Sequence, residues 1–358
     1  MIILNVSLNG IYGFDNFSIN FSYPKKIVNS IIDDEHLVNR PRFRYKKAVI
    51  LMGANATGKT SLGKALIRIF RFLKDENTAS LFEMLTKEKG TFCIDFVCDD
   101  YELHRLTVKL NSRTHEIKID YKKSEINEMD SYEMCVAKLM ECPFKIDSFR
   151  NISYRFAYPE IEKSIKLSQL DKSILLKTLK AVIGTLDPTL QNVKVSKDLK
   201  DTFIIKRKNT EIIIQEGKLL NRDVLSSGTV EGIDVSLFLA SMMNSNNTFY
   251  YCDEHFSYIQ SDIEKKIFGI MLDYIGKNEQ LIFTTHNTDM LDLNMPKHSY
   301  MFLRKQLENN RYNVTSISAS EILKRNTDSI RSAVENDVFN TMPDDSLLNE
   351  LEKGWKNG

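Results

Sequence analysis

Hydrophobic and polar positions alternate in the first part of the chain, which is the pattern of half-buried strands. Residues 1–22 alternate in this way and predict a strand, a turn and a second strand. Residues 91–121 repeat the alternation three times and predict a β meander. A further region, residues 202–215, predicts a hairpin with its bend at residues 209–210.

Between the meander and this hairpin, apolar residues no longer recur at every second position but at the three- to four-residue spacing of a helix. Residues 124–190 have this helical pattern, and Leu175, Leu179, Val182 and Leu186 form one apolar stripe. We therefore predict a helical insertion between two β-containing parts of one domain.

From residue 225 onward, helical and strand patterns alternate. A helical stripe at residues 230–240 is followed by the strand 248–252, a helix over 261–276 and the strand 281–285. Strands that alternate with helices pair in parallel through right-handed crossovers. The sequence therefore predicts an α/β fold with a parallel or mixed core sheet.

Two segments have the capping-box pattern of a helix N-terminus, in which a serine is followed three residues later by glutamate. They are Ser261-Asp-Ile-Glu264 and Ser318-Ala-Ser-Glu321. The second predicts a further helix in a C-terminal part that we expect to remain helical to its end.

The motif with the clearest chemistry is Gly53-Ala-Asn-Ala-Thr-Gly-Lys-Thr60, a P-loop. The apolar run Ala48–Met52 precedes it, and a helical stripe from Leu62 to Leu73 follows, which is the strand–loop–helix context that the motif requires. Backbone N–H groups of such a loop, together with a helix N-terminus, bind phosphate. We predict ATP binding by the following residues: Gly53, Asn55, Ala56, Thr57, Gly58, Lys59, Thr60 and Ser61.

Polar residues follow two of the downstream strands. Asp253 and Glu254 end the strand 248–252, and His286 follows Thr284-Thr285 at the end of the next strand. In a nucleotide site, Asp253 and the Thr60 hydroxyl would hold Mg²⁺, and Glu254 would polarise the attacking water. His286 could donate to the γ-phosphate, although a lone histidine after a strand is more often a turn residue.

Composition sets limits on the remaining possibilities. The 358 residues carry a formal net charge of +1, which gives no bulk electrostatic reason to expect nucleic acid or an acidic membrane as a partner. No apolar run approaches the roughly 20 residues of a membrane span. The five cysteines have no metal-binding spacing, and the N-terminus lacks the features of a signal peptide. We expect a soluble, cytoplasmic protein without a membrane partner.

The order of these motifs resembles the ABC-class ATPases. The P-loop is followed by a long insertion, then by Leu225-Ser-Ser-Gly-Thr229, by Asp253-Glu254 and by a strand ending in His286. The asparagine of the P-loop is similar to that of the non-transporter branch, which includes SMC-like, RecF-like and OLD-like proteins. The N-terminal strands and the signature are similar to those of small AAA-type ATPases of bacterial anti-phage operons.

The resemblance implies an ABC-ATPase head with an N-terminal antiparallel β lobe and a helical insertion. It places the N-terminal part of the head in residues 1–123, the insertion in 124–195, the C-terminal part in 196–300 and a strand and helical tail in 301–358. It also implies a homodimer or higher homo-oligomer that encloses two ATP molecules. Ser226 and Gly228 of one protomer would then contact the γ-phosphate bound to the other.

Glu254 would be the catalytic base and His286 the γ-phosphate sensor in such a dimer. Two departures from the family pattern stand out. None of Gln169, Gln191 and Gln215 has a convincing Q-loop position, and His255 follows the two acids where many relatives have proline.

Four functions are compatible with these motifs. The leading one is an ATPase that senses or regulates a separate effector, a nuclease or toxin, in antiviral defence. The alternative is a RecF- or SMC-like ATPase clamp in DNA repair or on chromosomes. A transporter subunit would need a membrane partner. A nuclease would need a TOPRIM domain, for which the 72 residues after His286 (358 minus 286) are too few.

Overall fold

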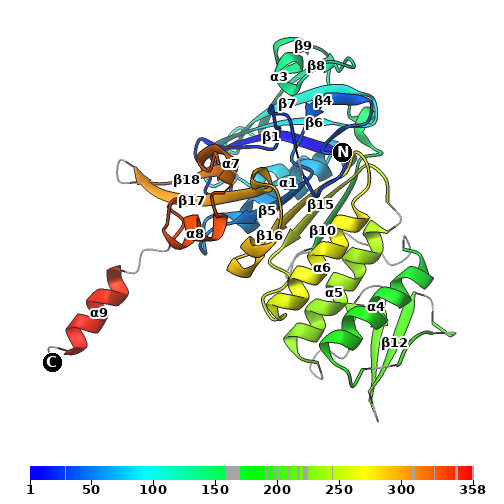
Figure 1. Cartoon of the computed structure of the whole chain (residues 1–358). Coiled ribbons are helices and arrows are strands. Elements are labelled where there is room, and N and C mark those ends of the chain that lie inside the picture. Colours follow the sequence, from blue (N-terminus) through cyan, green and yellow to red (C-terminus); the bar gives the residue numbers. More distant parts are fainter. Residues whose placement is uncertain are drawn as a thin grey trace.

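The described part of the chain contains four β-sheets, of which two have six strands, one has four and one has two. The structure is a computed structural model, and Figure 1 shows its elements. It describes all residues except 29, 158–169, 191, 197, 200, 208–209, 216–217, 221–224, 244, 309–310, 326, 343–345 and 357–358.

The core sheet has the strand order β10-β15-β16-β5-β17-β18. Its first five strands are parallel, and β18 pairs antiparallel with β17. The bounds are β10 (Ser153–Ala157), β15 (Thr248–Asp253), β16 (Gln280–Thr284), β5 (Ala48–Met52), β17 (Tyr300–Glu308) and β18 (Arg311–Ser318). The predicted mixed core sheet is therefore confirmed.

The second sheet is an antiparallel lobe with the order β2-β1-β6-β7-β8-β9. It contains the predicted strand, turn and strand at the N-terminus and the predicted meander. The bounds are β1 (Ile2–Asn9), β2 (Phe17–Asn20), β6 (Lys89–Val97), β7 (Glu102–Asn111), β8 (Glu116–Glu125) and β9 (Met140–Glu141). A short pair, β3 (His36–Leu37) and β4 (Arg40–Arg44), lies beside it.

The P-loop helix α1 (Lys59–Asp75) packs between these two sheets. Side chains of β5 alternate between the two faces of the core sheet. Val49 and Leu51 join α1 and the lobe in one hydrophobic core, whereas Ile50 and Met52 face the opposite core. That opposite core contains α5 (Ser227–Met242) and α6 (Ser261–Tyr274). The all-apolar sequence of β5 follows from this burial on both faces.

The prediction of a helical insertion over residues 124–195 needs correction. This stretch contains α3 (Tyr132–Ala137) and α4 (Lys172–Leu186), but also β10, which pairs in parallel with β15 at the edge of the core sheet. The pattern failed because a short aromatic run such as Ser-Tyr-Arg-Phe-Ala has too few residues to show a period. Its pairing with a strand about 95 positions downstream has no local signal. The domain boundaries themselves remain predictions.

The third sheet forms a small lobe together with α4 and α5 (Figure 1). Its strands are β11 (Asn192–Val195), β12 (Thr202–Arg207), β13 (Thr210–Gln215) and β14 (Lys218–Leu219). β12 and β13 are the predicted hairpin. Thr210 begins β13, and Asn209, the other predicted bend residue, lies outside the described residues.

The C-terminal part begins as the β17–β18 hairpin and then becomes helical. Its helices are α7 (Ala319–Ile322), α8 (Ile330–Glu335) and α9 (Ser346–Lys356). The short elements elsewhere are α2 (Ala79–Phe82) and the 3-10 helices η1 (Ile146–Phe149), η4 (Thr288–Asp292) and η5 (Lys297–Ser299). Among the described residues, no helix combines the length and hydrophobicity needed to cross a bilayer.

The two large sheets are joined by a buried amide at the start of β16. Gln280 is fully buried, and its Oε1 accepts a hydrogen bond of 2.8 Å from the backbone N–H of Ile3 in β1. Its Nε2 donates to the carbonyl oxygens of Ile3 and Lys46, each at 3.1 Å. One side chain therefore satisfies three backbone groups that water does not reach.

We predict that Gln280→Ala lowers the free energy of unfolding by about 2–4 kcal/mol, because it leaves buried backbone groups without partners. Urea denaturation followed by circular dichroism measures this difference. The exposed Gln260→Ala is the matched control and should change stability by less than about 0.5 kcal/mol. Equal stability of the two variants would contradict the bridging role of Gln280.

Candidate functional site

Parallel pairing brings three of the predicted motifs to the same edge of the core sheet. In the sheet register, Asp253 at the end of β15 lies beside Thr284 at the end of β16. Thr284 in turn lies beside Leu51 of β5, two residues before the P-loop. Ligand sites of open α/β sheets lie at the carboxyl ends of their strands, so the topology places the candidate site here.

The P-loop (residues 53–58) follows a path that two of its glycines make possible. Gly58 has φ of 98°, and a Cβ atom there would lie 2.7 Å from the ring of Phe14. A Cβ atom at Gly53 would lie 2.5 Å from the carbonyl oxygen of Leu303. The buried Thr57 hydroxyl donates to the Ala54 carbonyl at 2.8 Å and closes the turn. Gly53 and Thr57 therefore shape the loop from within.

Lys59 is the first residue of α1, and its side chain turns back over the loop. Its Nζ donates to the Gly53 carbonyl oxygen at 2.7 Å and lies 3.1 Å from Oε1 of Glu254. The side chain is 4% exposed, so its charge is held at the loop surface by these oxygen atoms. The P-loop lysine and the second acid of β15 are thus in direct contact.

Asp253 and Thr60 are joined by a hydrogen bond between their side chains, and the Thr284 hydroxyl donates to Oδ1 of Asp253 at 2.8 Å. Burial raises the pKa of the Asp253 carboxyl group, and these hydroxyl groups and the Lys59 charge partly oppose that rise. A carboxylate next to a hydroxyl is an oxygen donor set that suits Mg²⁺. Asp253 and Thr60 are therefore suited to hold Mg²⁺.

Glu254 leaves the strand in a left-handed conformation, with φ of 45°. Its backbone N–H donates to the Thr284 hydroxyl at 3.1 Å, which fixes this turn. A non-glycine residue adopts the left-handed region at a cost of order 1–2 kcal/mol, and such residues concentrate at functional sites. The conformation brings the Glu254 side chain to a position where it lines two adjacent cavities.

The first cavity has a volume of about 670 Å³ and lies over the P-loop. Six predicted residues line it: Asn55, Ala56, Gly58, Lys59, Thr60 and Ser61. Six further residues line it together with Glu254: Tyr12, Gly13, Phe14, Lys305, Tyr312 and Val314. Sequence reasoning missed this second group, although the aromatic residues next to Gly13 were a usable signal. Lys305 lies over the Tyr312 ring, 5.1 Å from its centroid, on the β17–β18 hairpin.

This lining fits a nucleotide and its metal. P-loop residues with one lysine and two hydroxyl groups line it, and so do aromatic residues and a second lysine. Aromatic faces suit a purine base, and lysines suit phosphate oxygens.

The second cavity, of about 240 Å³, contains the predicted sensor His286. His286 is exposed, and it lines the cavity together with Glu254. The residues on either side of it are fixed by the buried Glu264, whose oxygens accept from Thr285 Oγ1 at 2.9 Å and Asn287 Nδ2 at 2.6 Å. Burial raises the pKa of the Glu264 carboxyl group.

The capping-box interpretation of Ser261 and Glu264 was wrong. Gln260 is the N-cap of α6, and its side chain makes no cap hydrogen bond. Glu264 turns instead toward β16 and positions the His286 turn. At Ser318, which is the N-cap of α7, the predicted side-chain cap bond is also missing.

The signature segment lies at the N-terminus of α5. Ser226 is its N-cap, and its Oγ accepts from the Thr229 N–H at 3.2 Å. A Cβ atom at Gly228 would lie 2.7 Å from the Tyr258 carbonyl oxygen. The Tyr258 N–H donates to Glu231 at 3.0 Å, so α5 contacts the turn of residues 255–260 twice. Neither Ser226 nor Gly228 lines the P-loop cavity of the same chain in the described structure.

The structure shows where His255 and one of the three candidate Q-loop glutamines lie. His255 is buried in the turn after Glu254. Gln215 ends β13 in the small lobe, away from the core-sheet edge that carries the P-loop. Gln169 and Gln191 lie outside the described residues.

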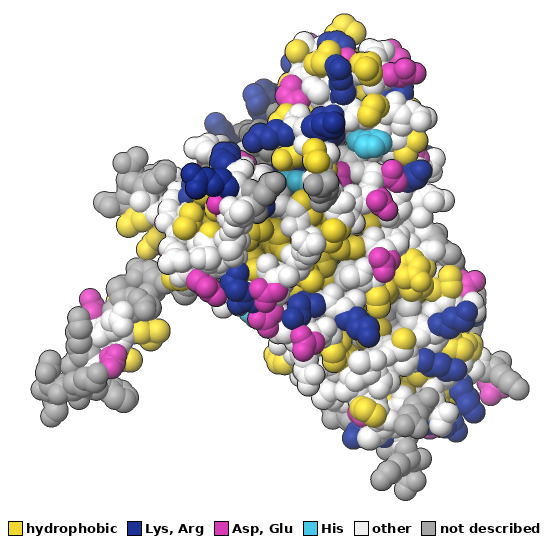
Figure 2. Space-filling model, in the orientation of Figure 1, with side chains coloured by type: hydrophobic (Ala, Val, Ile, Leu, Met, Phe, Trp, Pro, Cys, Tyr) yellow, Lys and Arg dark blue, Asp and Glu magenta, His cyan; other side chains and the backbone are white. Residues whose placement is uncertain are grey.

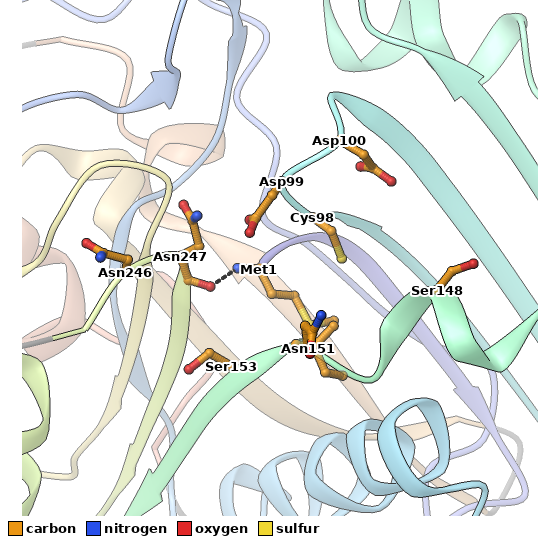
Figure 3. Close-up of a pocket in the computed structure, with 10 residues that line it drawn as sticks. Met1, Cys98, Asp99, Asp100, Ser148, Asn151, Ser153, Asn246 and Asn247 are labelled. Atoms are coloured by element: carbon orange, nitrogen blue, oxygen red, sulfur yellow. Dashed lines mark hydrogen bonds between the residues drawn. The ribbon is translucent and has the colours of Figure 1, made fainter. Parts of the chain in front are cut away.

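A separate polar cluster lies on the antiparallel lobe. The side-chain ligand atoms of Asp100, Glu102 and His104 all lie within 4.8 Å of one another, a grouping that sequence analysis did not foresee. Each is bonded within the protein, His104 to Asp100 and Tyr121 and Glu102 to Lys123. Asp100 also borders a cavity of about 330 Å³ at the seam of the two large sheets, where the Met1 amine donates to the Asn247 carbonyl (Figure 3).

The fold is similar to those of solved ATPase heads. One is an SMC head bound to the C-terminal winged-helix domain of ScpA, with 12% identity, a TM-score of 0.51 and coverage of 90% of this chain and 100% of that one. Another is an SMC head with an extended coiled coil, bound to the C-terminal domain of ScpA from Pyrococcus furiosus. It has 11% identity, a TM-score of 0.52 and coverage of 89% and 97%.

This chain therefore has an ABC-like ATPase head fold with a parallel core sheet and an antiparallel β lobe. No model of a known protein family matches the chain, and no curated protein matches it.

We predict that Gly228→Ala weakens the contact between α5 and the 255–260 turn, because the added methyl group meets the Tyr258 backbone. The free energy of unfolding should fall by about 1–3 kcal/mol, as in other overpacked sites. Gly269→Ala in α6, where a Cβ atom meets nothing within 4 Å, is the control. It should be neutral or stabilise by up to about 1 kcal/mol. Denaturant unfolding measures both, and a harmless Gly228→Ala would argue against the close contact.

We predict that Asp253→Asn makes the protein more stable near neutral pH when nucleotide and metal are absent. The raised pKa of Asp253 means that the folded state holds its proton more tightly than the unfolded chain does. The resulting stabilisation is complete below the ordinary carboxyl pKa of 3.8 and is lost as pH rises through the folded-state pKa. The advantage of Asn should therefore disappear in acid. Unfolding curves across this pH range measure it, and an advantage that persists in acid would contradict the cause.

Proposed function

We propose that this protein is an ATPase in which Lys59 binds the phosphates, Thr60 and Asp253 hold Mg²⁺, and Glu254 acts on the attacking water. The observation that carries the proposal is the convergence of these four residues at one sheet edge, with Lys59 3.1 Å from Glu254. Bound Mg²⁺ would neutralise charge that develops on the phosphate oxygens.

Glu254 has the position that a general base requires. Its carboxylate lies at the boundary between the P-loop cavity and the cavity that contains His286. The left-handed turn and the Thr284 hydroxyl fix its backbone, so that the carboxylate can accept a proton from water at a defined place. His286, which lines the second cavity together with Glu254, would donate a hydrogen bond to the transferred phosphoryl group.

We propose further that a second protomer completes each site with Ser226 and Gly228. Both lie at the N-terminus of a 16-residue helix, whose partial positive charge and free N–H groups attract phosphate. Ser226 is exposed and lies outside the P-loop cavity of its own chain, which leaves it available to another chain. ATP enclosed in this way stabilises the dimer, and hydrolysis weakens it.

The larger role that we propose is regulation of a separate effector, a nuclease or toxin, in antiviral defence. The support is the resemblance of the P-loop, the signature and the N-terminal strands to ATPases of anti-phage operons. This role is tested by purifying the protein from cells that express its native operon, with ATP present and after a phage challenge, and looking for a bound effector. Isolation of the ATPase without a partner, together with salt-dependent DNA binding, would favour the DNA clamp instead.

If each ATP site contains residues of both protomers, a mixture of two inactive variants should regain activity. Lys59→Ala and Ser226→Arg should each reduce ATP hydrolysis by about 100-fold or more, because each removes or blocks groups that bind the transition state. In an equal mixture, half of the dimers pair the two variants, and one of their two sites is intact. Hydrolysis should therefore recover to about a quarter of the wild-type rate.

The matched control mixes Lys59→Ala with a chain that carries both substitutions, because no intact site can form there. A phosphate-release assay measures all mixtures. Recovery that does not exceed this control would contradict the composite site.

A further inference from the structure

The C-terminal helix α9 presents an apolar face to solvent. Leu347, Leu348 and Leu351 are 76%, 69% and 55% exposed. Figure 1 shows the helix standing away from the rest of the chain. The chain after α8 is held on the body as far as Phe339, which stacks on Phe302 of β17 with ring centroids 4.1 Å apart.

A helix of 11 residues is too short to be stable alone in water, and exposed leucines favour a partner surface. The three leucines lie on one side, since positions 347 and 351 are one turn apart and 348 is their neighbour. At 100° per residue, Glu350 and Glu352 flank this leucine face on opposite sides. The surface that receives α9 should therefore be apolar in its centre and basic at its rim.

One cavity of the protein has this composition. It has a volume of about 500 Å³ and lies between the segment after β2, η5 and the end of α7. Four lysines line it: Lys25, Lys26, Lys297 and Lys324. Four apolar residues also line it: Ile27, Val28, Met295 and Leu323. We call it the lysine pocket, and Figure 2 shows Lys and Arg side chains gathered in the region of α7.

The wall of the lysine pocket is held rigidly. His298 is buried, its Nε2 lies 2.6 Å from Oε1 of the buried Glu35, and its ring stacks on Tyr23 with centroids 4.4 Å apart. Both Tyr23 and His298 line the pocket. By contrast, the apolar Val28, which also lines the pocket, is 66% exposed. A firm wall beside exposed apolar surface is suited to receive a helix that gains its stability on docking.

We propose that α9 of one copy docks in the lysine pocket of a second copy of this chain. Leucines would cover Ile27 and Val28, and the two glutamates would approach the lysines. The helix points away from its own body, so the second copy is the occupant that this geometry favours. Reciprocal exchange forms the contact twice about a two-fold axis, which is a low-cost route to a dimer. The contact involves no nucleotide-site residue and does not depend on the proposed ATPase activity.

Charge reversal on each of the two surfaces tests this proposal. All variants carry Lys59→Ala and are studied without nucleotide, so that dimers held together by ATP cannot form. One variant carries Glu350→Lys and Glu352→Lys, and the other carries Lys25→Glu and Lys324→Glu. Each should weaken self-association by about tenfold or more, measured by analytical ultracentrifugation. Glu128→Lys with Glu133→Lys, two exposed sites near α3, makes the same charge change and should leave association unaltered.

Mixing the two variants is the decisive step. In a mixed dimer both contacts are again complementary, one as in the wild type and the other with its signs exchanged, so dimers should reappear. Docking of α9 on its own chain cannot be rescued by mixing. Failure of the mixture to associate, or a wild-type background that is monomeric without nucleotide, would overturn the proposal.

Discussion

The hydrogen-bonded register of β5, β15 and β16 is the constraint on which the candidate site depends. These strands are parallel, so their carboxyl ends share one edge, where residues more than 190 positions apart become neighbours. The Tyr251 hydroxyl reinforces this arrangement by donating to the Lys59 carbonyl at 2.6 Å, which ties β15 to the first turn of α1. A shift of the register would separate Asp253 from Thr60 and would dismantle the site.

The charges at this edge hold one another in place. Asp253 is 1% exposed, and it is stabilised there by two threonine hydroxyls and by the nearby Lys59 charge. Lys59 is itself held by a loop carbonyl and by Glu254. Removal of Lys59 would leave the buried Asp253 charge without a nearby cation, which costs more than the lost contact alone. The protein thus maintains a costly arrangement that is suited to phosphate and metal and that adds little stability by itself.

The sequence was sufficient for the parts of the site that are encoded locally. The P-loop, its strand and helix, and the acids after β15 are contiguous motifs, and the fold class followed from their order. The sequence was insufficient where a partner comes from a distant segment. β10 has five residues and its pairing strand lies far downstream, and Lys305 and Tyr312 reach the P-loop cavity only because β17 pairs with β5. Glu264 fitted a local capping pattern, but its hydrogen bonds are to a neighbouring strand end.

The close packing of Gly228 against Tyr258 joins α5 to the turn that follows Glu254. Helix α5 shares one hydrophobic core with α4 and the small sheet, and a second core with Phe256 and Ile259 of this turn. Within the turn, the Glu254 carbonyl accepts a hydrogen bond from the Ser257 hydroxyl at 3.1 Å. A sliding movement of the small lobe would press on the Tyr258 carbonyl in the turn that follows this glutamate. A molecule that binds to the outer surface of the small lobe would therefore act, through α5, on the turn beside the candidate site.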